Sequence, residues 1–384
     1  MKRSTVQSFL QEHFTQYQQS HLMPLYQLKA VTRLMSCRTE ALGGHAIYCE
    51  EGHLNGVWYN SCKHRSCPQC GAINSAQWLK KSESLVLECK HHHWIFTLPH
   101  ELHCIWLFNR AFCQTLLMQS VRKTIQKLSA DDKYLAAVPG FISALHTWAR
   151  NLIFHPHVHC LISHGGINKQ GKWQWPKRKC FIPAKVLMAI FRGKFLAGVQ
   201  AALNKGELVI PSRMNEQQVK SLCNKWGRKE WVIHCVKPYE HGRGVVKYLA
   251  KYIRGGSIKN RQIIAITKEH VRYCYKSHQT KKTEFINLKH DDFMDRLLSH
   301  IAQPKKQQYQ MLGIYHNKCR EKLNLARAEF LQKEIDKVDK IGWQEFLENH
   351  DIKQNCKECG KPLSVLKPLN ELEDMTQLNL ISTY

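Results

Sequence analysis

Three histidines stand at alternate positions in the short run of residues 154–166: His155, His157 and His159. Successive side chains of an extended strand point to opposite faces, so these three imidazoles are predicted to share one face. Neutral imidazole is a common metal ligand, whereas each imidazole in a packed core needs its own hydrogen-bond partner. The run therefore predicts a metal-binding face. The alternative, ordinary surface or core histidines, is the commoner meaning of an isolated His-x-His.

Two tyrosines four residues apart, Tyr248 and Tyr252, form a second candidate. On a helix they would lie one above the other, so both phenol oxygens could reach the same point. A phenol has a pKa of about 10, so a nucleophilic tyrosine needs a nearby cation to favour the phenolate. Lys247, Lys251 and Arg254 provide cations here, and phosphate chemistry would need the same groups. The alternative is an amphipathic helix that uses both rings in its core.

A third group contains cysteines and histidines at close spacing. Its members are Cys37, His45, Cys49, His53, Cys62, His64, Cys67 and Cys70. Cys67-Pro-Gln-Cys70 has the form of a zinc knuckle, in which two thiolates close a tight turn around one tetrahedral ion. Cys49 and His53 could supply the other pair, and two ions are possible, with Cys37, His45, Cys62 and His64 as the reserve ligands. The alternative is that some of these residues only form turns.

A later Cys356-x-x-Cys359 pair is a weaker zinc signal, because no second pair stands beside it. His350, or His316 with Cys319, could complete such a site, and the sequence does not choose between them. The remaining cysteines have apolar or aromatic neighbours and are predicted to be small buried side chains without chemistry. They are Cys104, Cys113, Cys160, Cys180, Cys223, Cys235 and Cys274.

The balance of charge indicates a polyanionic partner. The 384 residues include 57 Lys and Arg against 30 Asp and Glu, a formal net charge of +27, and nucleic acid is the first candidate. A membrane surface is the rival, but we expect no apolar run long enough to span a bilayer. The amino terminus has no apolar signal core, which predicts a cytoplasmic protein, associated with the nucleoid when bound to DNA. No P-loop spacing occurs, so no nucleotide cofactor is expected.

The order of these motifs resembles one family of DNA enzymes. His157-Val158-His159 followed by the Tyr248-x-x-x-Tyr252 helix resembles the HUH endonucleases, in the two-tyrosine branch of insertion-sequence-91-like rolling-circle transposases. Further matching runs are Phe96-Thr97-Leu98-Pro99, Leu145-His146-Thr147-Trp148, Asn151 to His159, Cys37-Arg38-Thr39 and Leu42-Gly43-Gly44-His45. The resemblance covers residues 20–325. In that family a Cys-x-x-Cys often stands where this chain has Cys49 and His53.

The resemblance implies an α+β fold, an HUH endonuclease with a ferredoxin-like or RRM-like antiparallel sheet, preceded by a small zinc-binding domain. It also implies that a tyrosine cleaves one DNA strand, while His157 and His159 hold Mg²⁺ or Mn²⁺. His146 or His155 is the candidate third ligand. The implied partners are single-stranded DNA at transposon ends and target DNA, with structural zinc as a second cofactor.

The elements that must position these residues follow from periodicity. Helices are predicted in residues 4–36, 101–129, 291–301 and 318–349, together with the tyrosine helix. Strands are predicted at 92–98, 141–148, 157–163, 231–236, 262–266, 271–275 and 284–288. The expected domains are a helical lead-in (1–36), a zinc-binding DNA-binding domain (37–90), a catalytic domain (91–303) with an insertion at 167–229, and a helical tail (304–384).

Basic residues surround the knuckle, among them Lys63 and Arg65, with Trp58, Tyr59 and Trp78 between them. Cations for phosphates and flat rings for bases predict single-stranded DNA binding, although a charge run is usually a solvated face. Gly242 and Gly244 either let the backbone approach DNA phosphate or form a turn.

Three other functions use some of the same residues. A rolling-circle replication initiator or relaxase shares the tyrosine chemistry and differs in the DNA it recognises. A non-catalytic, zinc-dependent DNA-binding regulator would leave both tyrosines dispensable. A zinc hydrolase would use activated water, but the histidine run lacks a glutamate that could act as its general base.

Overall fold

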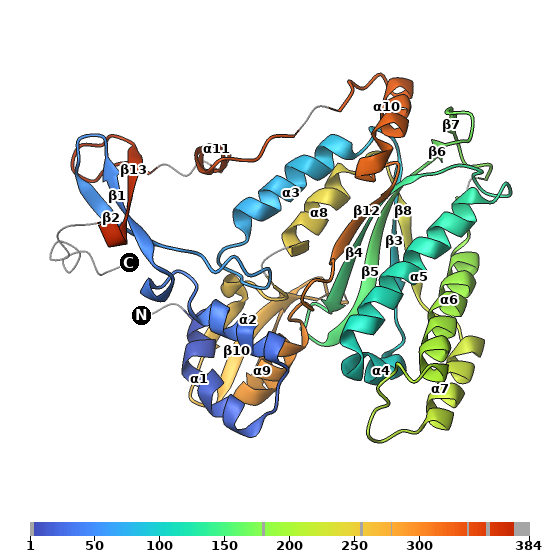
Figure 1. Cartoon of the computed structure of the whole chain (residues 1–384), viewed down its shortest axis with the longest axis horizontal. Helices are drawn as coiled ribbons and strands as arrows, with labels where there is room; N and C mark the ends of the chain where they lie inside the picture. Colours follow the sequence, from blue (N-terminus) through green and yellow to red (C-terminus); the bar gives the residue numbers. More distant parts are fainter. Residues whose placement is uncertain are drawn as a thin grey trace. The chain divides into compact units, whose positions relative to one another are not determined.

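The computed structural model describes residues 4–178, 181–253, 256–277, 279–335, 338–350 and 354–371 (Figure 1). The chain forms two compact units. One consists of Met1–Gln77, Arg254–Ile301 and Asp339–Tyr384, and the other of Trp78–Ile253 and Ala302–Val338. Residues 256–277 and 279–301, which the sequence-based division assigns to the catalytic domain, therefore fold with the amino-terminal segment.

The second unit is built on a five-stranded sheet with the order β12-β4-β5-β3-β8, in which every pair is antiparallel. Its strands are β3 (His91–Thr97), β4 (Gly140–Trp148), β5 (Phe154–Ser163), β8 (Ile233–Tyr239) and β12 (Tyr309–Gly313). Along the chain, β3, β4, β5 and β8 with their intervening helices follow the β-α-β-β-α-β order of ferredoxin-like folds. The predicted α+β fold class is confirmed, as are the strands expected near residues 92–98, 141–148, 157–163 and 231–236.

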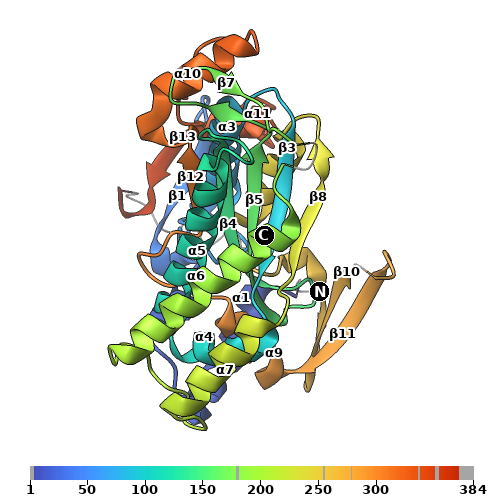
Figure 2. The same ribbon diagram turned by 90° about the vertical axis from the view of Figure 1, so that its right-hand side faces the viewer.

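One face of this sheet is covered by helices, as seen in Figure 2, where α5 and α6 cross in front of the strands. The helices are α4 (His103–Phe108), α5 (Arg110–Ala130), α6 (Ala184–Asn204) and α7 (Glu216–Arg228). Trp94, Phe96 and Val158 alternate inward from the strands into their shared core. The helix predicted over 101–129 is divided at Asn109, whose side chain exchanges hydrogen bonds of 2.7 and 2.8 Å with the backbone of Val209.

The structure differs from the predicted insertion at residues 167–229. Helix α6 contributes Phe191 and Phe195 to the main core, and the Phe191 ring packs edge-on against Phe96 of β3 at 5.2 Å. It is thus the second covering helix of the sheet. By length and composition alone, α6 is also the one helix of the described chain that could cross a membrane, a test that buried core helices such as this one pass as well.

The opposite face of the sheet packs against α3 (Ala72–Leu85) and α8 (Arg243–Ile253), which carries both tyrosines. Figure 1 shows α8 on one side of the strands and α5 on the other. Val246 and Leu249 of α8 are fully buried. A Cβ added to Gly242 would lie 2.9 Å from Val86 and 3.0 Å from Leu161, and the Gly242 carbonyl accepts the first backbone bonds of the helix. Gly242 therefore forms a tightly packed turn.

Smaller elements complete the second unit. They are the hairpin β6 (Gly166–Ile167) and β7 (Trp173–Gln174), helix α10 (Arg320–Glu329) and the 3-10 turns η2 (His100–Leu102) and η4 (Asn317–Cys319). The helix predicted over 318–349 was wrong in its middle, because residues 331–335 and 338–342 are not helical.

The first unit contains two separate groups of packed helices and strands. The first group has a three-stranded sheet and three helices. The strands are β9 (Ile263–Ile266), β10 (His270–Lys276) and β11 (Thr283–Lys289), and the helices are α1 (Val6–Ser20), α2 (Leu25–Met35) and α9 (His290–Ser299). Phe9 packs edge-on against Phe293 at 4.9 Å, and Gln27 donates a buried hydrogen bond of 2.9 Å to the Leu298 carbonyl. The predicted strands and helices in these ranges are confirmed.

The second group contains a three-stranded sheet of order β13-β1-β2. Strands β1 (Gly44–Cys49) and β2 (Leu54–Tyr59) form a hairpin, and β13 (Leu363–Pro368) pairs with β1 from the far end of the chain. The remaining elements are α11 (Trp343–Glu348), η1 (Glu40–Leu42), η3 (Asn260–Gln262) and η5 (Leu369–Glu371).

Candidate active site and zinc centre

Strand β5 directs His157 and His159 to the face of the sheet that packs against α8. His159 is paired with Ala144 of β4 and Ile95 of β3, and both neighbours lie on this same face. The Nε2 atoms of His157 and His159 are 3.2 Å apart. The alternation predicted from the sequence thus brings two imidazoles to one point.

The register of β4 against β5 adds a third imidazole. His146 lies directly opposite His157, and its ring centroid is 4.5 Å from that of His159. The potential ligand atoms of His146, His157 and His159 all lie within 4.8 Å of one another. His155, the alternative third ligand, lies outside this group. Its carbonyl oxygen instead accepts a 2.7 Å hydrogen bond from Nδ1 of His157, which leaves the Nε2 lone pair of His157 available to a metal.

A fourth histidine, His93 of β3, contacts this cluster. Its Nε2 lies 2.9 Å from Nδ1 of His159 and links two adjacent strands. His93 lies in a predicted strand, but no sequence motif assigns it a role. Strand alternation could have identified His93 from the sequence. It places His91, His93 and Ile95 on one face, and Ile95 is the strand partner of His159.

Burial sets the charge state of the cluster. It lowers the pKa of His157 to about 4, and it lowers the pKa of both His146 and His159 well below the usual value, with further lowering from neighbouring imidazoles. Burial likewise lowers the pKa of His93 to about 4. These imidazoles are therefore neutral at pH 7, as metal ligation requires.

The tyrosine helix places one ring at this cluster. The Tyr248 ring centroid lies 5.5 Å from that of His159 and 6.4 Å from that of His93. Lys247 is exposed on the same helix. The side chains of Tyr252 and Lys251, and the whole of Arg254, lie outside the described residues.

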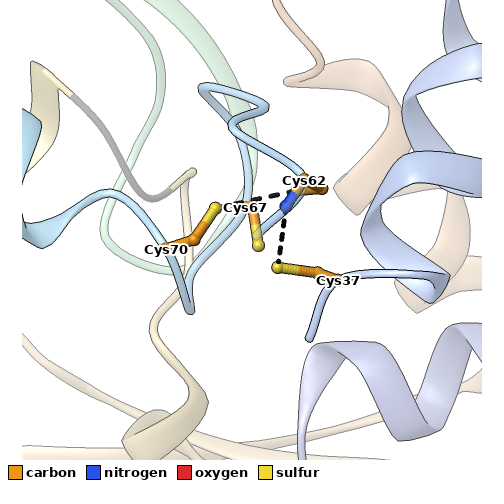
Figure 3. A group of neighbouring side chains, drawn as sticks. All are labelled: Cys37, Cys62, Cys67 and Cys70. Atoms are coloured by element: carbon orange, nitrogen blue, oxygen red, sulfur yellow. Dashed lines mark hydrogen bonds between the residues drawn. The ribbon is translucent and has the colours of Figure 1, made fainter. Parts of the chain in front are cut away.

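Four cysteines of the first unit converge (Figure 3). Cys37 follows α2, Cys62 follows β2, and Cys67 and Cys70 precede α3. Their sulfur atoms lie within 4.8 Å of one another, with Cys62 and Cys70 at 3.7 Å. Zinc–thiolate bonds of about 2.3 Å imply about 3.8 Å between sulfurs of a tetrahedral site. The four side chains therefore fit one structural zinc ion.

The structure brings Cys67 and Cys70 together with two of the reserve ligands. Their partners are Cys37 and Cys62, whereas Cys49 and His53 lie at the other end of the β1–β2 hairpin with Cys356 and Cys359. Among the described residues, His45 and His64 belong to neither group. The spacing of a short motif identifies one pair of ligands, but tertiary structure selects the second.

The two basic residues predicted to bind DNA near the knuckle lie between Cys62 and Cys67. Lys63 is exposed in a left-handed backbone conformation with φ of 55°, and Arg65 is half-buried. Of the cysteines expected to be buried, Cys113, Cys160 and Cys223 are buried. Cys235 is exposed, so that prediction was wrong, and Cys180 lies outside the described residues.

Comparison with known proteins finds related transposases. Residues 140–322 match the family model described as "Putative transposase", and residues 9–98 match the "Transposase zinc-binding domain". The chain is 30% identical over 301 residues to "Putative transposase y4qJ" of Sinorhizobium fredii, covering 77% of this chain and 76% of that protein. It is 27% identical over 304 residues to the "Transposase for insertion sequence element IS801" of Pseudomonas savastanoi pv. phaseolicola, covering 76% of this chain and 71% of that protein.

These matches define the class as a DNA transposase with an amino-terminal zinc-binding domain. The chain belongs to the insertion-sequence-91-like family of transposases.

Proposed function

We propose that this transposase cuts and rejoins single DNA strands through a tyrosine–phosphodiester intermediate during rolling-circle transposition. The observation that carries the proposal is the position of Tyr248, whose ring lies 5.5 Å from His159 in the cluster of three buried imidazoles. A potential nucleophile and a potential metal site therefore adjoin on one face of one sheet.

The donor set fits a divalent cation. His146, His157 and His159 would hold the ion, and three neutral imidazoles leave coordination positions open for DNA oxygens. Oxygen ligands from the phosphate make the set compatible with Mn²⁺ or Mg²⁺. When bound, the cation neutralises charge on the scissile phosphate. The buried rings hold the three nitrogens in place before the DNA arrives.

In the proposed step, the Tyr248 oxygen attacks the scissile phosphorus. A bond forms between the phenol oxygen and phosphorus, and the bond from phosphorus to the 3′ oxygen of the preceding nucleotide breaks. The phenol loses its proton, and the departing oxygen takes one up to become a 3′ hydroxyl. The product is a 5′-phosphotyrosine. No water is consumed, so a 3′ hydroxyl of another strand can attack the phosphotyrosine and complete strand transfer.

The second tyrosine supplies a second attachment point. Tyr252 follows Tyr248 by one helical turn on α8, so donor and target strands could be held in succession. We propose that Lys247, Lys251 and Arg254 bind the phosphates beside them, as do Lys63 and Arg65 near the zinc centre. The formal net charge of +27 supports binding to DNA ends and target DNA, and association with the nucleoid. The chemistry needs no nucleotide cofactor.

A covalent-adduct assay tests the proposal. Labelled single-stranded DNA carrying the element's end is incubated with protein and Mn²⁺, then separated on a denaturing gel. We expect a metal-dependent protein–DNA band that Tyr248→Phe reduces and that Tyr248→Phe with Tyr252→Phe abolishes. Tyr239→Phe, which alters an exposed tyrosine of β8, is the matched control and should retain the band. DNA binding on a native gel without any covalent band would instead support the regulator function.

A further inference from the structure

The Cys356-x-x-Cys359 pair of the carboxy-terminal tail lies beside the tip of the β1–β2 hairpin. We propose that Cys49, His53, Cys356 and Cys359 bind a second structural zinc ion. This ion fastens the carboxy-terminal strand to the amino-terminal zinc-binding segment, and it is separate from the four-cysteine centre.

The distances fit a tetrahedral ion. Cys49 and Cys359 have their sulfurs 3.7 Å apart, and Nδ1 of His53 lies 3.5 Å from the Cys49 sulfur and 3.7 Å from the Cys356 sulfur. Bonds of about 2.3 Å to sulfur and about 2.0–2.1 Å to nitrogen imply edges of about 3.8 Å and 3.6 Å. A disulfide would need its sulfurs at about 2.05 Å, so these thiols are not cross-linked to one another. The group therefore has the dimensions of a Cys₃His zinc site.

Each half of the site is a tight turn closed by backbone hydrogen bonds. In the hairpin, Cys49 ends β1, and its N–H donates to the His53 carbonyl at 3.2 Å. In the tail, the N–H of Gly360 donates to the Cys356 carbonyl at 3.0 Å, and Gly360 has a φ of 72°, a conformation that favours glycine. Both turns therefore present their ligands in fixed positions.

Polar groups around the ligands favour the bound state. The Asn55 amide donates to the Cys356 sulfur at 3.1 Å, and the backbone N–H of Glu358 donates to the same sulfur at 3.4 Å. Donors of this kind stabilise a thiolate. The Nε2 of His53 lies 3.7 Å from the Glu358 carboxylate, the type of partner that orients metal-bound imidazoles.

The first centre does not require these ligands. Cys37, Cys62, Cys67 and Cys70 already provide the four thiolates of a complete tetrahedral site. Two complete ligand sets within one unit therefore indicate two ions.

The second ion would have a structural consequence that the first lacks. Cys49 and Cys359 are 310 positions apart, and β13 pairs with β1 immediately beside the site, with Cys49 opposite Leu363. Bringing two segments so far apart in the sequence together costs chain entropy, and the metal–ligand bonds offset that cost. Strand β13 should therefore stay paired only while zinc is bound.

Metal analysis of the full-length protein tests this inference. Zinc content is measured for the wild type, for Cys356→Ser/Cys359→Ser, and for Cys274→Ser as a control outside both groups. We expect the double variant to lose one zinc ion per chain and the control to lose none. Equal zinc content in the double variant and the wild type would overturn the inference.

Cobalt substitution provides a second readout. Only cobalt bound by thiolates gives thiolate-to-cobalt charge-transfer absorption, so an ion held by histidines alone does not contribute to the signal. If the double variant does not fold, His53→Cys still tests the site, because this variant keeps four ligands and should keep the fold. We expect this variant to retain both ions and to gain absorption, because the second site then has four thiolates. Unchanged absorption would show that His53 is not a ligand and would contradict the proposed site.

Discussion

The Nε2 atom of His93 on β3 lies 2.9 Å from Nδ1 of His159 on the adjacent strand β5. If His159 binds a metal through Nε2, its Nδ1 carries the hydrogen and donates it to His93. His93 is then a positioning residue that fixes both the tautomer and the ring orientation of a ligand.

Removing this contact should weaken metal use. We expect His93→Ala to raise the Mn²⁺ concentration for half-maximal DNA cleavage by about 10–100-fold, whereas His93→Gln, which keeps an acceptor, recovers part of the loss. The measurement is a Mn²⁺ titration of cleavage rate at saturating DNA. An equal fall in rate for both variants at every Mn²⁺ concentration would indicate a purely structural role.

His146 and His155 should differ as ligands. Only His146 lies with His157 and His159 within 4.8 Å. We therefore expect His146→Ala to weaken Mn²⁺ binding by at least about tenfold, because removing a residue that merely hydrogen-bonds to a metal ligand already costs about that much. His155→Ala should change binding less. Electron paramagnetic resonance of free Mn²⁺ measures both affinities. A larger loss in His155→Ala would exclude the ligand set proposed here.

A buried histidine away from the proposed metal site should make stability depend on pH. Nδ1 of His91 donates to the Cys89 carbonyl at 2.8 Å, and Nε2 accepts from the Tyr315 hydroxyl at 2.7 Å, a bond that only the neutral ring can accept. Burial lowers the pKa of His91 to about 4. Between pH 6.5 and 4 the unfolded chain binds a proton that the folded chain does not, so the free energy of unfolding falls as pH falls, by about 3 kcal/mol in total.

Urea unfolding across this range, for the wild type and His91→Gln, measures the contribution of His91. The variant cannot titrate, and its free energy of unfolding should therefore fall less steeply below pH 6.5. Identical pH slopes in the two proteins would contradict the assignment of a neutral buried imidazole at this position.

Helix α6 should be essential to the stability of the second unit. Phe191 is fully buried against Phe96 and Trp231, so we expect Phe191→Ala to lower the free energy of unfolding by about 3–5 kcal/mol. Val209→Ala, at an exposed position of the same segment, should change it by less than about 0.5 kcal/mol. Urea denaturation measures both. A negligible effect of Phe191→Ala would support the interpretation of residues 167–229 as an insertion.

The sequence predicted those features that depend on local periodicity. Alternation placed His157 and His159 on one face, and the spacing of Tyr248 and Tyr252 predicted the helix α8. The third imidazole could not be selected in this way. His155 shares the alternation, and the choice of His146 depends on the register between β4 and β5, which is set by the packing of the whole sheet.

Long-range pairing explains the other differences. Cys49 and His53 have ligand spacing of their own, but their partners in the structure follow some three hundred positions later, at Cys356 and Cys359. No local pattern encodes that contact. Similarly, α6 is hydrophobic enough to be identified as a buried helix, yet the sheet face that it covers is determined only when β3 and β8 come together.

Identification of the nucleotide-bearing residue tests the central claim most directly. Protein incubated with single-stranded DNA and Mn²⁺ is digested with nuclease and protease, and the nucleotide-bearing peptide is sequenced by mass spectrometry. We predict a 5′-phosphate linked to the phenol oxygen of Tyr248 or Tyr252, within the peptide that contains α8. A nucleotide attached to any other residue, or DNA cleavage that leaves no covalent peptide, would contradict the tyrosine mechanism.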